Sequence, residues 1–207
     1  MISKNQQKLN SGFHAKSEPK EILEGIDLSG KTAIITGASK GIGKAIALHL
    51  ASCGANISLV ARNQLELDKV KNKILDSGGQ AQSLVGDVSN LDSFNEIVSL
   101  TMEKWNDIHI LVNNAGAAWG AKIGDVPEIG WDKVMDLNAK SLFFLSQALL
   151  TPLQVAATKE DPARIINIGS VDGLAIPKLE TYSYPASKAA VHHLTRVMAH
   201  HLGKRNI

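Results

Sequence analysis

The 207-residue sequence has a single cysteine, few aromatic residues and no excess of charge of either sign. Cys53 has no partner for a disulfide within the chain, and its setting, HLASCGAN, favours a small buried residue. With 22 Lys and Arg against 20 Asp and Glu, the net charge of +2 gives no electrostatic argument for binding nucleic acid or an anionic membrane. These features favour a protein of the reducing cytoplasm.

The sequence also lacks a long apolar run. Residues 1–25 are polar with scattered lysines, and they contain neither the apolar region of a signal peptide nor a membrane anchor. We expect residues 1–25 to form a mobile N-terminal arm. Residues 26–207 are expected to form one domain, because this length and a hydrophobic content of 44% suit a single core.

From Lys31 onwards, apolar β-branched runs alternate with helical patterns. Strands that are apolar on both faces and separated by helices predict a doubly wound parallel sheet in three αβα layers. Such sheets bind ligands at the carboxyl ends of their strands, so functional residues should follow each run directly. The expected strands are KTAIIT, NISLVA, AQSLVGD, IHILVNN and RIINIGS, and the two longest expected helices cover residues 130–157 and 185–202.

The first expected strand runs into the glycine-rich turn TGASKGIG. Gly37, Gly41 and Gly43 are spaced G-x3-G-x-G, and Ser39 and Ile42 lie between them. Such a strand-to-helix turn lets the backbone approach a pyrophosphate, and the helix N-terminus attracts its charge. These five residues are therefore candidate cofactor contacts, although similar turns also occur without a ligand.

The end of the second expected strand carries a positive charge where NAD-binding folds place an acidic residue. Arg62 stands there, and Lys40 in the glycine turn adds a second positive charge. An acidic residue would bind the ribose 2′-hydroxyl, whereas two cations suit the 2′-phosphate of NADP, so NADP(H) is the predicted cofactor. A solvated loop charge is the alternative for Arg62 taken alone.

The third and fourth expected strands end in GDV and NNAG. Asp87 either accepts a hydrogen bond from an adenine amine or caps the following helix, and the residues alone leave both open. Val88 beside it is a further candidate cofactor contact. In NNAG, the small residues Ala115 and Gly116 let the backbone pass close to a ribose, while the amides of Asn113 and Asn114 tie neighbouring loops together.

The stretch TYSYPASKAA places Tyr184 four residues before Lys188, on one face of a helix that begins near Pro185. Tyr182 would project about 240° away from Lys188. A lysine charge about 4 Å from a phenol is worth about 4 kcal/mol at an effective dielectric near 20. That energy makes the tyrosine usable as an acid–base group near neutral pH. An ordinary i,i+4 pair is the alternative.

Two further polar residues follow the same logic. Ser170 comes after the fifth expected strand, where its hydroxyl can donate to a substrate oxygen. Asn138 lies inside a long expected helix, an unfavourable place for asparagine, and is a candidate for holding a water. His193, His200 and His201 share a face of the last helix, but a surface or subunit contact is favoured there and no metal is expected.

Six motifs occur in a fixed order, namely TGASKGIG, GDVS, NNAG, DLNAK, NIGS and YPASK. Together they resemble the short-chain dehydrogenase/reductase family over roughly residues 28–207. The resemblance implies that Tyr184 transfers a proton, that Ser170 holds the carbonyl or alcohol oxygen, and that Asn138 positions a relay water. It implies that Lys188 tunes the tyrosine and binds the nicotinamide ribose.

The resemblance also implies the partners of the protein. It implies NADP(H) as cofactor, a small carbonyl or alcohol substrate, and a homodimer or homotetramer in which the two long helices form subunit contacts. Within the family, the chain is most similar to 3-oxoacyl reductases, in particular those associated with rhamnolipid synthesis. The leading hypothesis is thus an enzyme that interconverts a ketone and a secondary alcohol.

The sequence differs from the family pattern after its last expected helix. Family members continue there with further strands and a loop that covers the substrate. We therefore expect the domain to be C-terminally incomplete, with RIINIGS as an open edge of the sheet. This difference motivates the alternative hypothesis, a non-catalytic nucleotide-binding or interaction protein.

Overall fold

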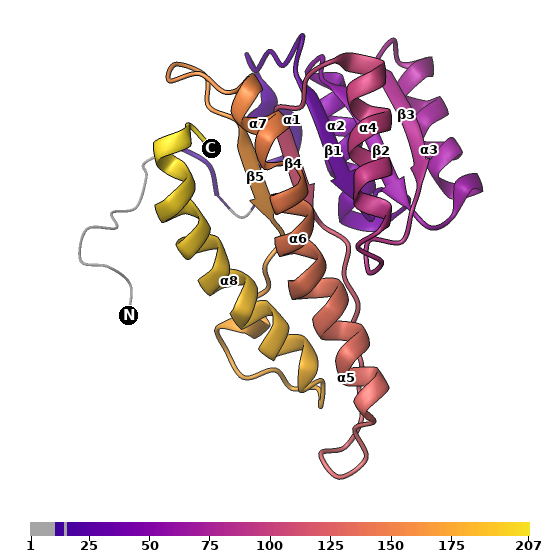
Figure 1. The fold of residues 1–207 in the computed structure, drawn as a ribbon, viewed down its shortest axis with the longest axis vertical. Helices are drawn as coiled ribbons and strands as arrows, with labels where there is room; N and C mark the ends of the chain where they lie inside the picture. Colours follow the sequence, from indigo (N-terminus) through magenta and orange to yellow (C-terminus); the bar gives the residue numbers. More distant parts are fainter. Residues whose placement is uncertain (1–10, 15) are drawn as a thin grey trace.

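The computed structural model describes residues 11–14 and 16–207, which contain a five-stranded parallel sheet (Figure 1). The strand order is β3-β2-β1-β4-β5, so the order reverses between β1 and β4. Ligands of such sheets bind beyond the carboxyl ends of the strands at this reversal. The predicted doubly wound parallel sheet is confirmed. The strands are β1 (Thr32–Thr36), β2 (Asn56–Ala61), β3 (Gln80–Val85), β4 (Ile110–Asn113) and β5 (Arg164–Asn167).

Helices cover both faces of this sheet, which gives the predicted three αβα layers (Figure 1). The described helices are α1 (Pro19–Leu23), α2 (Gly41–Ser52), α3 (Gln64–Asp76), α4 (Ser93–Trp105), α5 (Glu128–Met135), α6 (Ser141–Ala148), α7 (Leu150–Ala156) and α8 (Ser183–Leu202). On one face, α2 and α3 bury residues such as Ala47 and Leu67 against the sheet. On the other face, α4, α6 and α7 contribute Phe94, Leu145 and Leu153.

The long helix expected over residues 130–157 is interrupted. It consists of α5, the π-helical turn η1 (Asp136–Lys140), α6 and α7. The interruption contains the buried Asn138, whose side chain bonds to distant segments, as described below. The last helix begins at Ser183, slightly before the expected residue 185. Helices α5 and α8 contact each other and extend beyond the carboxyl ends of the strands (Figure 1).

The strands differ in burial according to their position in the sheet. All residues of β1 and β4 are buried, which agrees with the expectation of strands covered on both faces. The outer strand β3 has an exposed residue at each end, and the outer strand β5 has no fully buried residue. In β5, Arg164 and Ile166 are exposed. The strand ends at Asn167, three residues earlier than expected, although the Ile168 N–H still donates to the Asn113 carbonyl oxygen of β4 at 3.0 Å.

The expected N-terminal arm is described only in part. Residues 1–10 and 15 lie outside the described residues, and α1 lies within the remainder of the arm and buries no residue. None of the helices in ranges 11–14 and 16–207 combines the length and the hydropathy needed to span a bilayer.

Candidate active site

The glycine turn after β1 has a backbone that only glycine adopts easily. Gly37 has φ +64° and Gly41 has φ +56°, a region that L side chains rarely enter. Gly43 is required for packing instead, because a Cβ there would lie 2.5 Å from the carbonyl oxygen of Gly37. No side chain of the described residues caps the start of α2, so its first N–H groups remain available to an anion.

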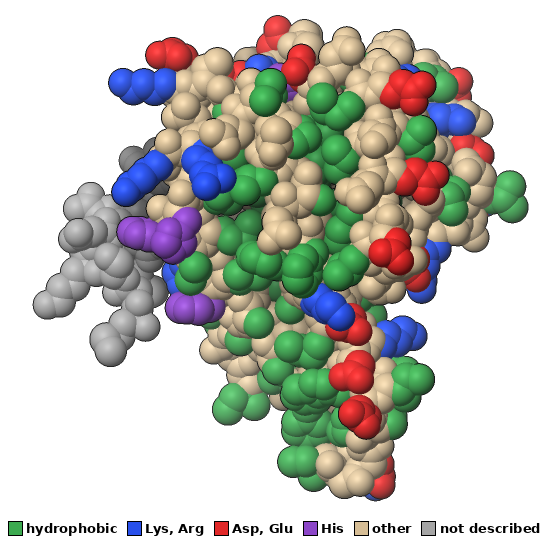
Figure 2. All heavy atoms as spheres, viewed as in Figure 1, with side chains coloured by type: hydrophobic (Ala, Val, Ile, Leu, Met, Phe, Trp, Pro, Cys, Tyr) green, Lys and Arg blue, Asp and Glu red, His purple; other side chains and the backbone are tan. Residues whose placement is uncertain are grey.

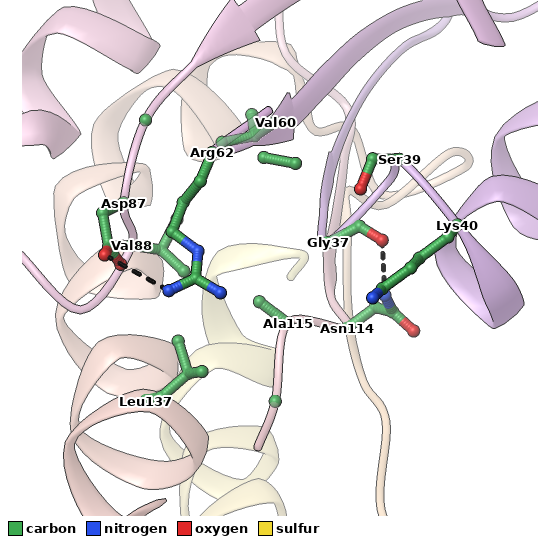
Figure 3. A pocket seen from close by; sticks show the side chains of 13 residues that line it. Gly37, Ser39, Lys40, Val60, Arg62, Asp87, Val88, Asn114, Ala115 and Leu137 are labelled. Carbon is green, nitrogen blue, oxygen red and sulfur yellow. Dashed lines mark hydrogen bonds and ion pairs between the residues drawn. The ribbon is translucent and has the colours of Figure 1, made fainter. Parts of the chain in front are cut away.

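A cavity of about 250 Å³ opens beside this turn, at the carboxyl ends of β1, β2, β3 and β4 (Figure 3). Nine of the predicted cofactor contacts line it: Gly37, Ser39, Lys40, Arg62, Asp87, Val88, Asn114, Ala115 and Gly116. The other predicted contacts, Gly41, Ile42, Gly43, Tyr184 and Lys188, do not line this cavity. Gly41, Ile42 and Gly43 form the first turn of α2, and Tyr184 and Lys188 belong to α8.

Sequence reasoning did not single out four other lining residues, namely Val60, Ala61, Gly86 and Leu137. A signal for each was present in the sequence. Val60 and Ala61 end the second apolar run directly before Arg62, and Gly86 belongs to the GDV motif. Leu137 precedes Asn138 in DLNAK, but its orientation depends on the π-helical turn, which the sequence pattern does not reveal.

Two cations and one carboxylate line the cavity. Figure 3 shows the Arg62 guanidinium pointing into the opening. It lies 3.9 Å from the Asp87 carboxylate. Lys40 lies on the other side of the opening in this view. The side chain of Arg62 is 73% exposed, so this ion pair is weak and leaves the guanidinium available to a stronger anion.

Asp87 is held by its own loop. Its Oδ1 accepts hydrogen bonds from the Ser89 main-chain N–H at 3.0 Å and from the Ser89 hydroxyl at 2.7 Å. Burial disfavours its charged form, but these hydrogen bonds and the Arg62 charge outweigh that effect and leave the pKa of Asp87 lowered. The alternative that Asp87 caps the next helix is wrong, because α4 starts at Ser93 and its N-cap position is Asp92.

Polar side chains join the loops after β1 and β4. The Thr36 hydroxyl oxygen accepts hydrogen bonds from the N–H groups of Asn114 at 2.9 Å and Ala115 at 3.0 Å. In return, the Asn114 side chain donates to the carbonyl oxygens of Thr36 at 2.9 Å and Gly37 at 3.3 Å. The predicted tie between neighbouring loops is therefore confirmed for Asn114, whereas the Asn113 amide donates to Ser146 on α6 and Asn167 on β5. Thr36 was not anticipated, because a threonine in a buried strand gives no such signal.

Tyr184 and Lys188 lie together on the first two turns of α8. The Lys188 Nζ is 5.8 Å from the centre of the Tyr184 ring. Lys188 is only 6% exposed, and its ammonium donates a hydrogen bond of 2.7 Å to the carbonyl oxygen of Ile168. Burial lowers the pKa of Lys188. The Tyr182 hydroxyl instead donates to the Glu180 carboxylate at 3.0 Å, an interaction that raises the pKa of Tyr182.

Ser170 follows β5 at the same end of the sheet. It is the N-cap of a short 3-10 turn, η2 (Val171–Gly173), and its Oγ accepts a hydrogen bond of 3.2 Å from the Asp172 main-chain N–H. The hydroxyl hydrogen therefore remains free to donate to a bound molecule. Gly173 rests directly on α8, since a Cβ there would lie 2.6 Å from the main-chain carbon of Lys188.

Asn138 is 2% exposed in η1 and joins three segments. Its Oδ1 accepts from the Ala117 N–H at 2.8 Å, and its Nδ2 donates to the Ala117 carbonyl oxygen at 2.9 Å and to the Ser187 hydroxyl at 2.9 Å. Both amide hydrogens are thus used within the protein. The side chain fixes the loop after β4 and η1 against α8, directly beside Tyr184 and Lys188.

The histidines of α8 do not assemble a metal site. Within the described ranges, no group of three or more His, Cys, Asp or Glu side chains is arranged to hold a metal ion. His200 and His201 pack edge to face against each other with ring centres 5.0 Å apart, and His193 contacts Arg196 at 3.3 Å. Cys53 is half-buried at the end of α2 and is not in a disulfide.

Comparisons with known proteins agree with this geometry. Residues 31–207 match the family described as short chain dehydrogenase. The chain is 39% identical over 175 residues to the rhamnolipids biosynthesis 3-oxoacyl-[acyl-carrier-protein] reductase of Pseudomonas aeruginosa. The aligned residues cover 84% of this chain and 68% of that protein.

Solved structures of similar proteins have the same fold as this chain. The structure described as Pseudomonas aeruginosa RhlG/NADP active-site complex superposes with a TM-score of 0.84 at 38% identity, over 88% of this chain and 71% of that one. A 7 alpha-hydroxysteroid dehydrogenase complexed with NADH and 7-oxo glycochenodeoxycholic acid superposes with a TM-score of 0.82 at 34% identity, over 88% and 69%. Because these two relatives hold different cofactors, the fold alone does not decide between them.

Proposed function

The chain belongs to the short-chain dehydrogenase/reductase family, and on this premise we propose that it reduces the ketone of a 3-oxoacyl thioester with NADPH. The chain is an oxidoreductase by family, and the substrate and the roles of single residues are our proposals. The observation that carries them is the buried Lys188 ammonium beside the Tyr184 ring. Burying an ammonium costs free energy unless a nearby negative charge compensates it, and the phenolate of Tyr184 would supply such a charge.

The residues that line the cavity beside the glycine turn suit part of a dinucleotide. Gly37 and Gly43 keep the turn free of side chains that would fill the space near Asn114, and the start of α2 offers N–H groups to a pyrophosphate. Arg62 and Lys40 supply positive charge for a 2′-phosphate, which favours NADPH over NADH. Bound NADPH supplies the hydride for the reduction. The Lys188 ammonium has three N–H donors, and one of them bonds to the Ile168 carbonyl oxygen. The other two remain for the hydroxyl groups of a ribose.

We propose that Tyr184 and Ser170 act on the carbonyl oxygen. As the carbonyl carbon receives a hydride, the C=O π bond breaks and negative charge develops on the oxygen. The Tyr184 hydroxyl transfers its proton to that oxygen, which completes the alcohol and leaves a phenolate that Lys188 stabilises. The Ser170 hydroxyl donates a hydrogen bond to the same oxygen, while the Asp172 amide occupies an acceptor position of Oγ. In the oxidation direction the same groups act in reverse.

The role of Asn138 divides into two parts. Its side chain holds the loop after β4, η1 and α8 together, which keeps the start of α8 in place. The relay water that the family resemblance implies at Asn138 stays a prediction. Since both side-chain amide hydrogens of Asn138 bond to protein atoms, such a water has to be held by the main-chain carbonyl oxygen of Asn138 or by the second lone pair of its Oδ1.

Apolar side chains beside the site support a substrate with an apolar chain. Between Ser170 and Tyr184, the side chains of Val171, Leu174, Ile176 and Leu179 are 70%, 77%, 97% and 74% exposed. Hydrophobic side chains also gather at the end of the molecule formed by α5 and the start of α8 (Figure 2). An acyl chain that covers this surface removes it from water at about 25 cal/mol per Å². The acyl-carrier substrate named for the Pseudomonas aeruginosa relative supports the same class.

The test is NADPH oxidation with a 3-oxoacyl thioester, followed at the nicotinamide absorbance. Tyr184→Phe should reduce turnover by about a hundredfold or more, because it removes the transferred proton, while NADPH binding measured by fluorescence stays within about twofold. Tyr182→Phe is the matched control, because its hydroxyl bonds to Glu180 instead. Near-normal turnover of Tyr184→Phe would disprove the proposed proton donor. NADPH binding without turnover of any ketone by the unsubstituted chain would favour the non-catalytic alternative.

A further inference from the structure

Helix α8 carries a third polar residue on the face that holds Tyr184 and Lys188. His192 lies four residues after Lys188, as Lys188 lies four after Tyr184, and residues four apart stack on one side of a helix. The His192 ring reaches the segment after β5. Its Nε2 accepts a hydrogen bond of 3.4 Å from the main-chain N–H of Ser170. The helix that positions the tyrosine thus also contacts the serine directly.

The backbone before Ser170 is adapted to this ring. A Cβ at Gly169 would overlap His192 Nε2 and would lie 2.8 Å from its Cδ2. Glycine at this position therefore lets the ring approach the Ser170 amide closely.

Three of the contacts between α8 and the segment from Ile168 to Gly173 determine how this segment is held. Lys188 Nζ donates to the Ile168 carbonyl oxygen, His192 accepts from the Ser170 amide, and Gly173 packs on the Lys188 backbone. The first and last of these contacts fix the two ends of the segment. Among the described residues, the His192 contact is the one that holds the main-chain N–H of the serine, and therefore the peptide from which the Ser170 hydroxyl projects.

We infer that His192 is a positioning residue, which holds Ser170 so that its hydroxyl meets the carbonyl oxygen of the substrate. This inference rests on the proposed function, since it needs a carbonyl substrate at Ser170. A hydroxyl that stabilises developing charge acts mainly in the transition state, so its misplacement lowers kcat more than it raises KM. Small displacements of such groups cost up to about a hundredfold in rate.

Three variants separate positioning from packing. His192→Leu keeps bulk but removes the acceptor, His192→Gln keeps an acceptor without the imidazole ring, and His193→Leu alters the exposed neighbour on the same helix. We expect His192→Leu to lower kcat by about tenfold or more with NADPH affinity unchanged, and His192→Gln to recover most of the loss. His193→Leu should match the unsubstituted chain. Thermal melting of each variant checks that it folds.

Two further measurements test the mechanism of the loss. In a Ser170→Ala background, His192→Leu should cost nothing more, because the hydroxyl that it positions is gone. Amide exchange followed by NMR should show the Ser170 N–H exchanging about tenfold faster in His192→Leu, and unchanged in His193→Leu.

The outcomes distinguish this inference from the proposed function. If the unsubstituted chain turns over ketones and His192→Leu keeps its kcat, or loses as much in the Ser170→Ala background, His192 does not position the serine. If the chain binds NADPH but reduces no ketone, the proposed function is wrong and the positioning role falls with it. An unchanged Ser170 exchange rate in His192→Leu would show that the hydrogen bond itself is absent in solution.

Discussion

Replacing Arg62 by alanine should weaken NADPH binding and leave NADH binding unchanged. The Arg62 guanidinium points into the cavity beside the glycine turn, where it is 3.9 Å from Asp87. A charge-assisted hydrogen bond is worth about 1.5–3 kcal/mol. Because the Arg62 side chain is 73% exposed, solvent screening reduces this to about 1–1.5 kcal/mol, which corresponds to about a tenfold rise in the NADPH Kd. NADH has no 2′-phosphate, so its Kd should change by less than about twofold.

The assay is a fluorescence titration of the nicotinamide at low and moderate ionic strength. Arg196→Ala is the matched control, because Arg196 is exposed on α8 and its guanidinium contacts His193 outside the cavity. The loss in Arg62→Ala should shrink at higher salt, since the interaction is partly exposed. Adding Lys40→Ala should lower the NADPH affinity by about another tenfold, because Lys40 also lines the cavity.

Two results would refute the assignment of the 2′-phosphate to this pair. One is an unchanged ratio of NADPH to NADH affinity in the double variant. The other is an equal loss for both cofactors in Arg62→Ala, which would mean that Arg62 supports the shared part of the dinucleotide. The comparison is informative because a relative of the same fold is complexed with NADH. Cofactor choice therefore has to come from side chains and not from the fold.

Two other predictions concern pH and assembly. Hydrogen bonds from Lys71, Gln64 and Ser83 lower the pKa of Asp68 from the ordinary 3.8 to about 2. This carboxylate should stabilise the fold above about pH 4 and lose that effect as the pH falls towards 2. The urea midpoint of unfolding should therefore fall less steeply between pH 5 and pH 2 in Asp68→Asn than in the unsubstituted chain. Identical slopes would contradict this role of Asp68. The apolar groove between α6 and α8, which Phe143, Leu194 and Val197 line, is a candidate subunit contact for the homodimer or homotetramer that the family resemblance implies. Sedimentation velocity should show an oligomer that Val197→Asp dissociates and Leu65→Asp on α3 does not, and a monomer at all concentrations would be inconsistent with that role for the groove.

The sequence was sufficient to predict the layers and the place of the cavity. Alternating apolar runs and helical patterns define a parallel sheet, and a parallel sheet puts the carboxyl ends of all its strands at one edge. Residues directly after the runs therefore meet in space although they are far apart in the chain. This is why Gly37, Arg62, Asp87 and Asn114 could be assigned to one site before their contacts were known, and all four line the same cavity.

Interactions that depend on long-range contacts could not be predicted in this way. The break in the long helix at η1 accompanies hydrogen bonds from Asn138 to Ala117 and Ser187, which are 21 and 49 residues away. A pattern of hydrophobic periodicity reports only on the neighbours of a residue within its own helix. The contact between His192 and Ser170 spans 22 residues and involves a main-chain N–H, which leaves no trace in side-chain patterns.

Helix α8 explains why local spacing nevertheless carries so much of the site. A helix converts a separation of four residues into a fixed direction and a rise of about 6 Å, so Tyr184, Lys188 and His192 keep their relative positions wherever the helix lies. The position of the helix itself must also be fixed, and two buried polar contacts of α8 do this. Asn138 bonds to Ser187 on the α8 turn between the tyrosine and the lysine, and Lys188 bonds to Ile168 just after β5. Breaking either contact leaves a buried polar group without a hydrogen-bond partner, so displacement of α8 costs about 1–3 kcal/mol per contact. This free energy also maintains the geometry of the proposed proton transfer.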